Sequence, residues 1–331
     1  MSAITTDGNL IHYEVLGRGR PVILVHGWIG SWRYWIPSMQ VLQLKYRVYA
    51  LDLYGFGDSA KNPQRYSLEH QVGLLDTFMK ELGIPKAALI GHGLGAMVVA
   101  EYARRSPENV PRVLITGAPL YDPGDLERRV PAERRPAPVR PAVPEPEAVS
   151  TSATVTSAGA AMRAAMIQAA RTRAAAPQEL APAVGFSALS NHNPLMPLME
   201  SPDALLAKCF RRSETNYEKL SVDVAKIDPA VLRQSVEGFD AGRLLDTLRL
   251  LSAPVLVIHG GDDPLIPPPN EAILNYITLD KEHSVMPILL PNVRHFPMLE
   301  DDRFGRLANE FLEAADMSKL AVKERWRRRT R

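Results

Sequence analysis

The chain has 331 residues, 46% of them hydrophobic, and a formal net charge of +2 at pH 7. This length is enough for one large α/β domain with an added module, and so small a net charge gives no general case for nucleic-acid binding. Cys209 is the single cysteine, so no internal disulfide can form, and we expect a reducing, cytoplasmic setting. We expect neither a secretory signal nor a membrane span, because no apolar run approaches roughly 18 residues.

Short apolar runs alternate with helical patterns over the first part of the chain. The run at 21–25 is apolar throughout, as in a strand that helices cover on both faces. The alternation predicts an α/β fold with a mostly parallel sheet and helices on both faces. The predicted strands are 9–16, 21–25, 46–51, 87–90 and 113–116, and the predicted helices are 67–82 and 94–105.

The alternation stops after Pro119. Residues 121–150 hold seven of the 28 prolines, a composition that favours a mobile linker over helix or sheet. The Ala-rich stretch 154–176 is predicted to be helical. We therefore expect a cap-like insertion at 120–239, with a Pro/Ala-rich low-complexity linker at 121–180.

The alternation resumes near residue 240. Residues 1–119 and 240–316 are thus the two predicted parts of one core. Residues 317–331 form a basic tail, in which 319–331 carry seven Lys/Arg against one Glu. We expect this tail to be solvated, with contact to an anionic surface as the alternative. The later predicted helices are 240–251, 271–276 and 303–314, and the later strands are 255–259 and 285–290.

The sequence GHGLGA at 91–96 lies between a predicted strand and a predicted helix. This is the context of the G-x-S-x-G nucleophile elbow, but Gly93 stands where the serine would be. Glycine has no atom that can attack a substrate carbon, and it adopts strained turn dihedrals with little penalty. The pattern also falls short of the dinucleotide-binding G-x-G-x-x-G, because residue 96 is Ala.

Four blocks together make the chain resemble the α/β-hydrolase fold family, in particular its esterases, epoxide hydrolases and haloalkane dehalogenases. They are HGW at 26–28, DLYGFGDS at 52–59, GHGLGA, and the pair HGGDDPLIP (259–267) and PNVRHFPMLE (291–300). The resemblance covers residues 1–118 and 240–315. It implies an α/β-hydrolase fold with a late, cap-like insertion.

The resemblance also implies a triad in the order nucleophile, acid, base. His295 takes the place of the base and Asp263 that of the acid that fixes its tautomer, with Asp262 as the alternative acid. Gly93 is the vacant nucleophile position. The backbone N–H groups of Trp28 and Leu94 would form the oxyanion hole.

Further residues are candidates for the pocket wall or for a replacement nucleophile. Trp28, Trp32 and Met196 are expected to contact substrate, with plain core packing as the alternative. Ser31 and Ser59 lie near the expected mouth but not on the elbow. Structural roles are expected for His26 and His92, and apolar packing for Cys209.

The function stays open between three readings. A chain without the nucleophile cannot run covalent ester hydrolysis, and it retains at most weak residual activity from the oxyanion hole. It could instead use His295 as a general base, as a hydrolase, lyase or cofactor-independent dioxygenase acting on a small, largely apolar substrate. It could also bind a small apolar or ester-like molecule as a non-catalytic, regulatory protein. We expect no metal, no organic cofactor and no nucleic-acid partner, since the sequence has no His/Cys cluster and no phosphate-binding loop.

Overall fold

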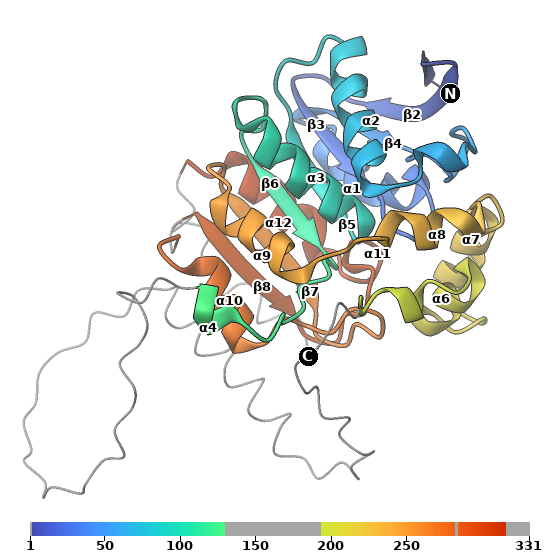
Figure 1. Ribbon diagram of the computed structural model, residues 1–331. Coiled ribbons are helices and arrows are strands. Elements are labelled where there is room, and N and C mark those ends of the chain that lie inside the picture. The colour runs from blue at the N-terminus through green and yellow to red at the C-terminus, as the bar shows by residue number, and fades with distance from the viewer. Residues whose placement is uncertain (1, 130–192, 282–283, 316–331) are drawn as a thin grey trace, which may run out of the picture.

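The computed structural model describes residues 2–129, 193–281 and 284–315. Their strands form one sheet in the order β1-β2-β4-β3-β5-β6-β7-β8 (Figure 1). The strands are β1 (Ser2–Thr6), β2 (Asn9–Leu16), β3 (Arg20–Val25), β4 (Tyr46–Leu51), β5 (Ala88–His92), β6 (Val113–Thr116), β7 (Val255–Gly260) and β8 (Val285–Leu290). Neighbouring strands from β4 to β8 are parallel, whereas β1 and β2 pair antiparallel.

Helices cover both faces of this sheet. Helices α2, α3, α9 and α10 pack in a row on one face, and α1 packs with α12 on the other. The helices of the described residues are α1 (Ile36–Leu42), α2 (Leu68–Glu81), α3 (Leu94–Arg105), α4 (Leu126–Arg129), α6 (Pro202–Cys209), α7 (Thr215–Val224), α8 (Pro229–Val236), α9 (Ala241–Leu250), α10 (Glu271–Thr278), α11 (Pro297–Glu300) and α12 (Arg303–Glu313). None of them has the length and hydropathy that a membrane span needs.

The predicted mostly parallel sheet is confirmed, and the predicted strands and helices lie within a few residues of the observed ones. Strand β1 was not predicted. It pairs with β2 through the two-residue turn Asp7-Gly8, whose φ angles of 48° and 75° suit a hairpin turn. Helix α1 was also missed.

The prediction of a linker from residue 121 is wrong at its beginning. Residues 126–129 form helix α4, and Arg129 bonds to Asp125 (2.6 Å) and to Asp246 of α9 (2.7 Å). Only one of the seven prolines, Pro123, precedes this helix, so the composition that resists helix begins at Pro131. The rest of the predicted linker, the Ala-rich stretch and the basic tail lie outside the described residues.

The described end of the predicted insertion forms a helical lobe of α6, α7 and α8 at one side of the sheet (Figure 1). This lobe contacts the loops that follow β3 and β4. An added Cβ at Gly30 would lie 3.2 Å from Leu220, and one at Gly55 would lie 2.8 Å from Val231. The lobe therefore covers the carboxyl ends of the strands, where open α/β sheets bind their ligands.

Candidate active site

The turn between β5 and α3 has the tight geometry of a nucleophile elbow. Gly93 has φ 53° and ψ −112°, in the left-handed region that residues with a Cβ rarely adopt. A Cβ at Gly91 would collide with the Gly95 carbonyl, and one at Gly95 would collide with the Val25 carbonyl. Glycines at all three positions let strand, turn and helix approach this closely.

The indole of Trp28 lies against the face of Gly93 from which a side chain would project. An ideal Cβ at residue 93 would lie 3.1 Å from Cε3 and 3.2 Å from Cζ3 of Trp28. The indole is 2% exposed, and its Nε1–H donates to Ser235 Oγ of α8 at 3.2 Å. The Trp28 ring therefore borders the position where a side chain at residue 93 would begin, and its bond to Ser235 ties the ring to the helical lobe.

Asp263 and His295 form a buried pair beside this turn. His295 Nδ1 lies 2.8 Å from Asp263 Oδ2, and Asp263 Oδ1 accepts backbone N–H bonds from Leu265 and Ile266 at 2.9 and 3.0 Å. Burial alone would raise the pKa of Asp263, but His295 and the backbone donors lower it to about 2. The alternative acid, Asp262, is exposed and is not the partner of His295.

Three groups that could meet a substrate have no hydrogen-bond partner within residues 2–129, 193–281 and 284–315. They are His295 Nε2 and the backbone N–H groups of Trp28 and Leu94. Because Asp263 binds Nδ1, the neutral ring carries its lone pair on Nε2. A proton acceptor and two backbone donors thus lie around Gly93.

His92 connects the loop after β3, which contains Gly27, to the backbone of His295. The carbonyl of His295 can only accept, so His92 Nε2–H donates to it (2.9 Å) and Nδ1 accepts from the Tyr34 hydroxyl (2.9 Å). Tyr34 in turn accepts the N–H of Gly27 at 2.5 Å. Burial first, and then repulsion from His295, hold the pKa of His92 well below its usual value. The ring is neutral and structural, as expected, but nothing in the sequence pointed to Tyr34 as its partner.

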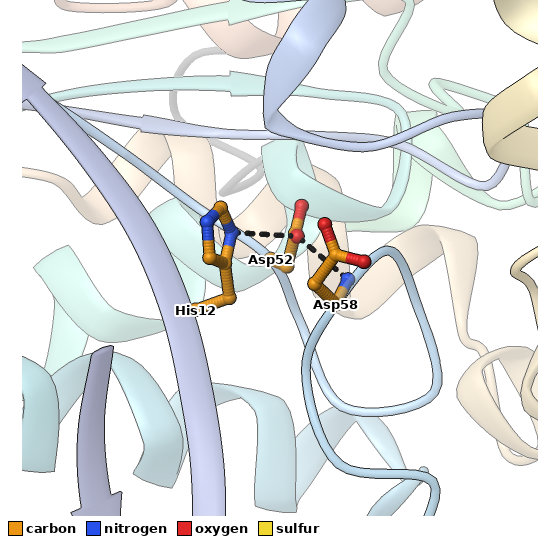
Figure 2. Close-up of side chains that lie close together, drawn as sticks. All are labelled: His12, Asp52 and Asp58. Carbon is orange, nitrogen blue, oxygen red and sulfur yellow. Dashed lines mark hydrogen bonds and ion pairs between the residues drawn. The ribbon is translucent and has the colours of Figure 1, made fainter. Parts of the chain in front are cut away.

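A second group, formed by the buried His12 and Asp52 with the half-buried Asp58, lies where β2 approaches the loop after β4 (Figure 2). Asp52 Oδ2 bonds to His12 Nδ1 (3.1 Å) and to the N–H of Asp58 (3.0 Å), while Oδ1 accepts the N–H of Trp32 (2.8 Å). The hydrogen bond to Asp52 raises the pKa of His12 despite burial. Asp52 thereby fixes both loops that border the elbow.

This second group does not fit a metal ion. Lys226 Nζ lies 2.6 Å from Asp58 Oδ1 and Arg33 lies 3.2 Å from Oδ2, so both oxygens of that carboxylate already have a cationic partner. Each oxygen of Asp52 accepts a backbone N–H. A cation bound here would have to displace these donors and would meet two positive side chains.

The remaining candidate residues lie apart from the pair. Trp32 packs against His12, with ring centroids 5.9 Å apart, and carries Arg33 over its face. Met196 is partly buried in a short 3-10 turn, Met196–Leu198. In the described part of the chain neither bonds to Asp263 or His295, so their role at a substrate stays a prediction.

The alternative nucleophiles are occupied or unreactive. Ser31 Oγ accepts the N–H of Arg33, and Ser59 Oγ donates to the Asp52 carbonyl at 2.7 Å. Cys209 is buried in α6, and burial raises the pKa of its thiol well above the usual value, which disfavours the thiolate.

Comparisons with known proteins agree with this architecture. The family model described as alpha/beta hydrolase fold matches residues 20–136. The thermophilic esterase of Thermogutta terrifontis superposes with a TM-score of 0.61 over 94% of this chain and 98% of its own, at 20% identity. The chain is an α/β-hydrolase-fold protein. The fold predicted from the four sequence blocks is therefore confirmed.

The chain is also similar to an epoxide hydrolase in sequence and to a lactonase in structure. Bifunctional epoxide hydrolase 2 of Rattus norvegicus is 37% identical over 122 residues, which are 35% of this chain and 22% of that protein. A serine-to-glycine variant of the N-acyl homoserine lactonase AidH, complexed with N-hexanoyl homoserine lactone, superposes with a TM-score of 0.58 at 22% identity, over 93% of this chain and 97% of its own.

The sequence matches cover only part of each relative. The chain spans between 21% and 38% of the length of the epoxide hydrolases that it matches. The family model ends at residue 136 and so includes the elbow but neither Asp263 nor His295.

Proposed function

We propose that this protein holds a small apolar or ester-like molecule at the carboxyl ends of its strands without forming a covalent intermediate. The observation that carries the proposal is Gly93 itself, which stands in the elbow turn and offers no nucleophilic atom, with the Trp28 indole 3.1 Å from where its Cβ would lie. A residue without a nucleophilic atom leaves no route to an acyl-enzyme or alkyl-enzyme at this position.

Groups that suit a bound carbonyl compound lie around Gly93 and support the proposal. The unpartnered N–H groups of Trp28 and Leu94 suit a carbonyl oxygen, and the surroundings of His295 are apolar and aromatic, with Phe296 and Phe210 packed together at 5.4 Å.

The lactonase variant supports this ligand class. That protein carries a glycine in place of a serine and is complexed with an N-acyl homoserine lactone. A chain of this fold can therefore hold a cyclic ester although one of its serines has become glycine. At 22% identity the comparison shows the fold alone, so the ester or lactone class belongs to the proposal.

A second candidate function is general-base catalysis by His295. The Nδ1 bond to Asp263 orients the ring, and Nε2 is free to take a proton from a substrate. A lyase or a cofactor-independent dioxygenase would use the pair in this way. A hydrolase would use the pair to activate a water beside Gly93.

Two measurements on the full chain test these functions. Calorimetric titration with N-hexanoyl homoserine lactone measures binding, and p-nitrophenyl butyrate reports hydrolysis. The proteins are the wild type, His295→Ala and, as a matched control, His70→Ala, which alters an exposed histidine of α2. We expect saturable binding of the lactone by the wild type and no burst of nitrophenol.

The outcomes separate the candidates. Turnover of the ester or of the bound lactone that His295→Ala lowers by about 10²–10⁴-fold, with His70→Ala unchanged, would assign general-base catalysis. A burst of nitrophenol would show a covalent intermediate and overturn the proposal. If the wild type does not bind the lactone and hydrolyses the ester no faster than His295→Ala does, the proposed ester-like ligand class is wrong.

A further inference from the structure

The amino ends of four neighbouring strands carry a row of cations. In the sheet order β4-β3-β5-β6 the strands are parallel, so their amino ends meet at one edge, opposite the candidate site. A lysine or arginine stands within two residues of the start of each strand. These residues are Lys45 and Arg47 at β4, Arg18 and Arg20 at β3, Lys86 at β5 and Arg112 at β6.

We name the part of this edge formed by β3 and β4 the amino-edge patch: Arg18, Arg20, Leu44, Lys45 and Arg47. All five are exposed. Lys45 pairs with Glu313, whereas the other three cations have no ion pair with a carboxylate in the described part of the chain. Unpaired like charges this close repel one another, so the patch favours an anionic partner.

The backbone holds the patch in a fixed form. Gly17 and Gly19 have φ of 77° and 112°, and a Cβ at either would collide with carbonyls of residues 43–46, so this turn packs directly onto the start of β4. Arg18 and Arg47 line an open depression of about 430 Å³ beside this turn. The guanidinium of Arg47 lies over the ring of Tyr49, 5.4 Å from the ring centroid.

An apolar side chain stands among these charges. Leu44 is 82% exposed, the most exposed large hydrophobic residue of the described chain, and Leu16 is 37% exposed on the neighbouring strand. Cations around a projecting leucine match the interface of an anionic bilayer, where charges meet headgroups and an apolar side chain enters the acyl boundary.

The chain beyond the described residues leaves from the same edge. The last residues of α12 bond to it, Glu313 to Lys45 and the carbonyl of Ala314 to Arg112. Residues 319–331, which follow, carry seven Lys/Arg and Trp326. This segment adds cationic charge that the same anionic surface would attract.

We propose that the amino-edge patch is a docking surface for an anionic phospholipid bilayer. A nucleic acid is the weaker match, because stacking on bases needs exposed aromatic rings and both tyrosines of this edge, Tyr46 and Tyr49, are buried. Docking at this edge would leave the carboxyl edge, with Gly93 and His295, directed away from the bilayer.

Vesicle flotation of the full chain tests the proposal. The vesicles are phosphatidylcholine alone or with about 30% phosphatidylserine, at about 0.1 M and about 0.5 M salt. The test variants are Arg18→Glu/Arg47→Glu and Leu44→Ser. The matched control is Arg212→Glu/Arg233→Glu, which makes the same charge change at exposed positions of the helical lobe. Circular dichroism verifies that each variant is folded.

We expect the wild type and the control to bind only the vesicles with phosphatidylserine and to release them at high salt. Arg18→Glu/Arg47→Glu should lower the partition coefficient at least about tenfold, and Leu44→Ser by a smaller factor. Equal binding by the patch variant and the control would overturn the proposal, since the basic tail would then act alone. It also fails if the wild type ignores anionic vesicles or binds an oligothymidylate in preference to them.

Discussion

Backbone strain and the packing of the Trp28 ring both favour a residue without a side chain at position 93. The turn holds residue 93 at φ 53°, where a residue with a Cβ is strained by on the order of 1–3 kcal/mol. Glycine removes that strain and also lets the indole approach to within 3.1 Å of the ideal Cβ position. Restoring a nucleophile therefore has to overcome both the strain and the packing.

Gly93→Ser should destabilise the fold by about 1–3 kcal/mol from strain, plus the cost of displacing the Trp28 ring. Gly83→Ser is the matched control, because Gly83 has φ 61° but a Cβ there would meet no atom within 4 Å. Urea unfolding measures both. Gly93→Ser should lower the free energy of unfolding more than Gly83→Ser does, and this difference should shrink in a Trp28→Ala background. Equal losses for the two serine variants would show that the Trp28 ring moves aside at no measurable cost.

Asp263 should make the stability depend on pH in the acid range. Its folded pKa of about 2 lies below the unfolded value of 3.8, so its contribution is fully present above pH ~4 and is lost as the pH falls toward 2. The shift corresponds to on the order of 2 kcal/mol. Asp263→Asn should remove this part of the pH profile measured by urea unfolding.

His295→Ala provides the check on the cause of that shift. Without the imidazole, burial is less opposed and the pKa of Asp263 should rise, so the loss of stability should begin at a higher pH than in the wild type. If stability began to fall at the same pH in His295→Ala as in the wild type, the imidazole would not be the cause of the lowered pKa of Asp263.

At the scale of elements, ion pairs connect the helical lobe to the loops around the candidate site. Arg33, in the 3-10 turn after β3, bonds to Asp223 of α7 at 2.9 Å and to Asp58 at 3.2 Å. Asp223 is 1% exposed, and burial raises its pKa even with Arg33 beside it. This carboxylate depends on its partner far more than an exposed one does.

Arg33→Leu should therefore destabilise the protein by about 1–3 kcal/mol near neutral pH. A carboxyl group with a raised folded pKa contributes its full stability to the protein below its unfolded pKa, and this contribution is lost as the pH rises. The destabilisation by Arg33→Leu should therefore grow from pH 5 to pH 7.5. Thermal unfolding at both pH values measures it. Adding Asp223→Asn should recover part of the loss, and Arg65→Leu, which breaks an exposed pair with Asp7, should cost under about 1 kcal/mol.

The elements that sequence reasoning located well are those whose signals are local. Helix 94–105 has the predicted bounds because a glycine turn begins it and Ser106, which precedes Pro107, ends it. Helix α1 was not predicted because Ile36–Leu42 is short and half exposed, so that its apolar residues show little helical periodicity. The lobe helices α6 to α8 could not be delimited, since they bury their apolar faces on loops distant in the sequence.

The same distinction applies to the candidate site. The pairing of Asp263 with His295 could be predicted because both follow strands whose carboxyl ends meet at one edge. The bond between Tyr34 and His92 joins positions 58 residues apart with no motif. The place of the Trp28 indole depends on a rotamer and on Ser235, 207 residues away, which no local pattern encodes.

At the scale of the whole molecule, one parallel sheet separates two chemically different edges. The carboxyl edge collects buried groups, Gly93, Asp263 and His295, under the helical lobe. The amino edge collects exposed cations, since no lobe covers it in the described residues. The rigid strands between the two edges make the candidate site and the amino-edge patch independent targets for substitution.

Two leucines, one inside the sheet and one in the turn before β4, test whether the amino edge is free in solution. Leu114 of β6 is fully buried in the middle of the sheet, so Leu114→Ala should cost about 2–5 kcal/mol. Leu44 is 82% exposed, so Leu44→Ala should change the free energy of unfolding by less than about 0.5 kcal/mol. Urea unfolding of the full chain in the absence of lipid measures both. A large cost for Leu44→Ala would mean that another segment or a second copy covers the leucine, and the amino-edge patch would then not be free to meet a bilayer.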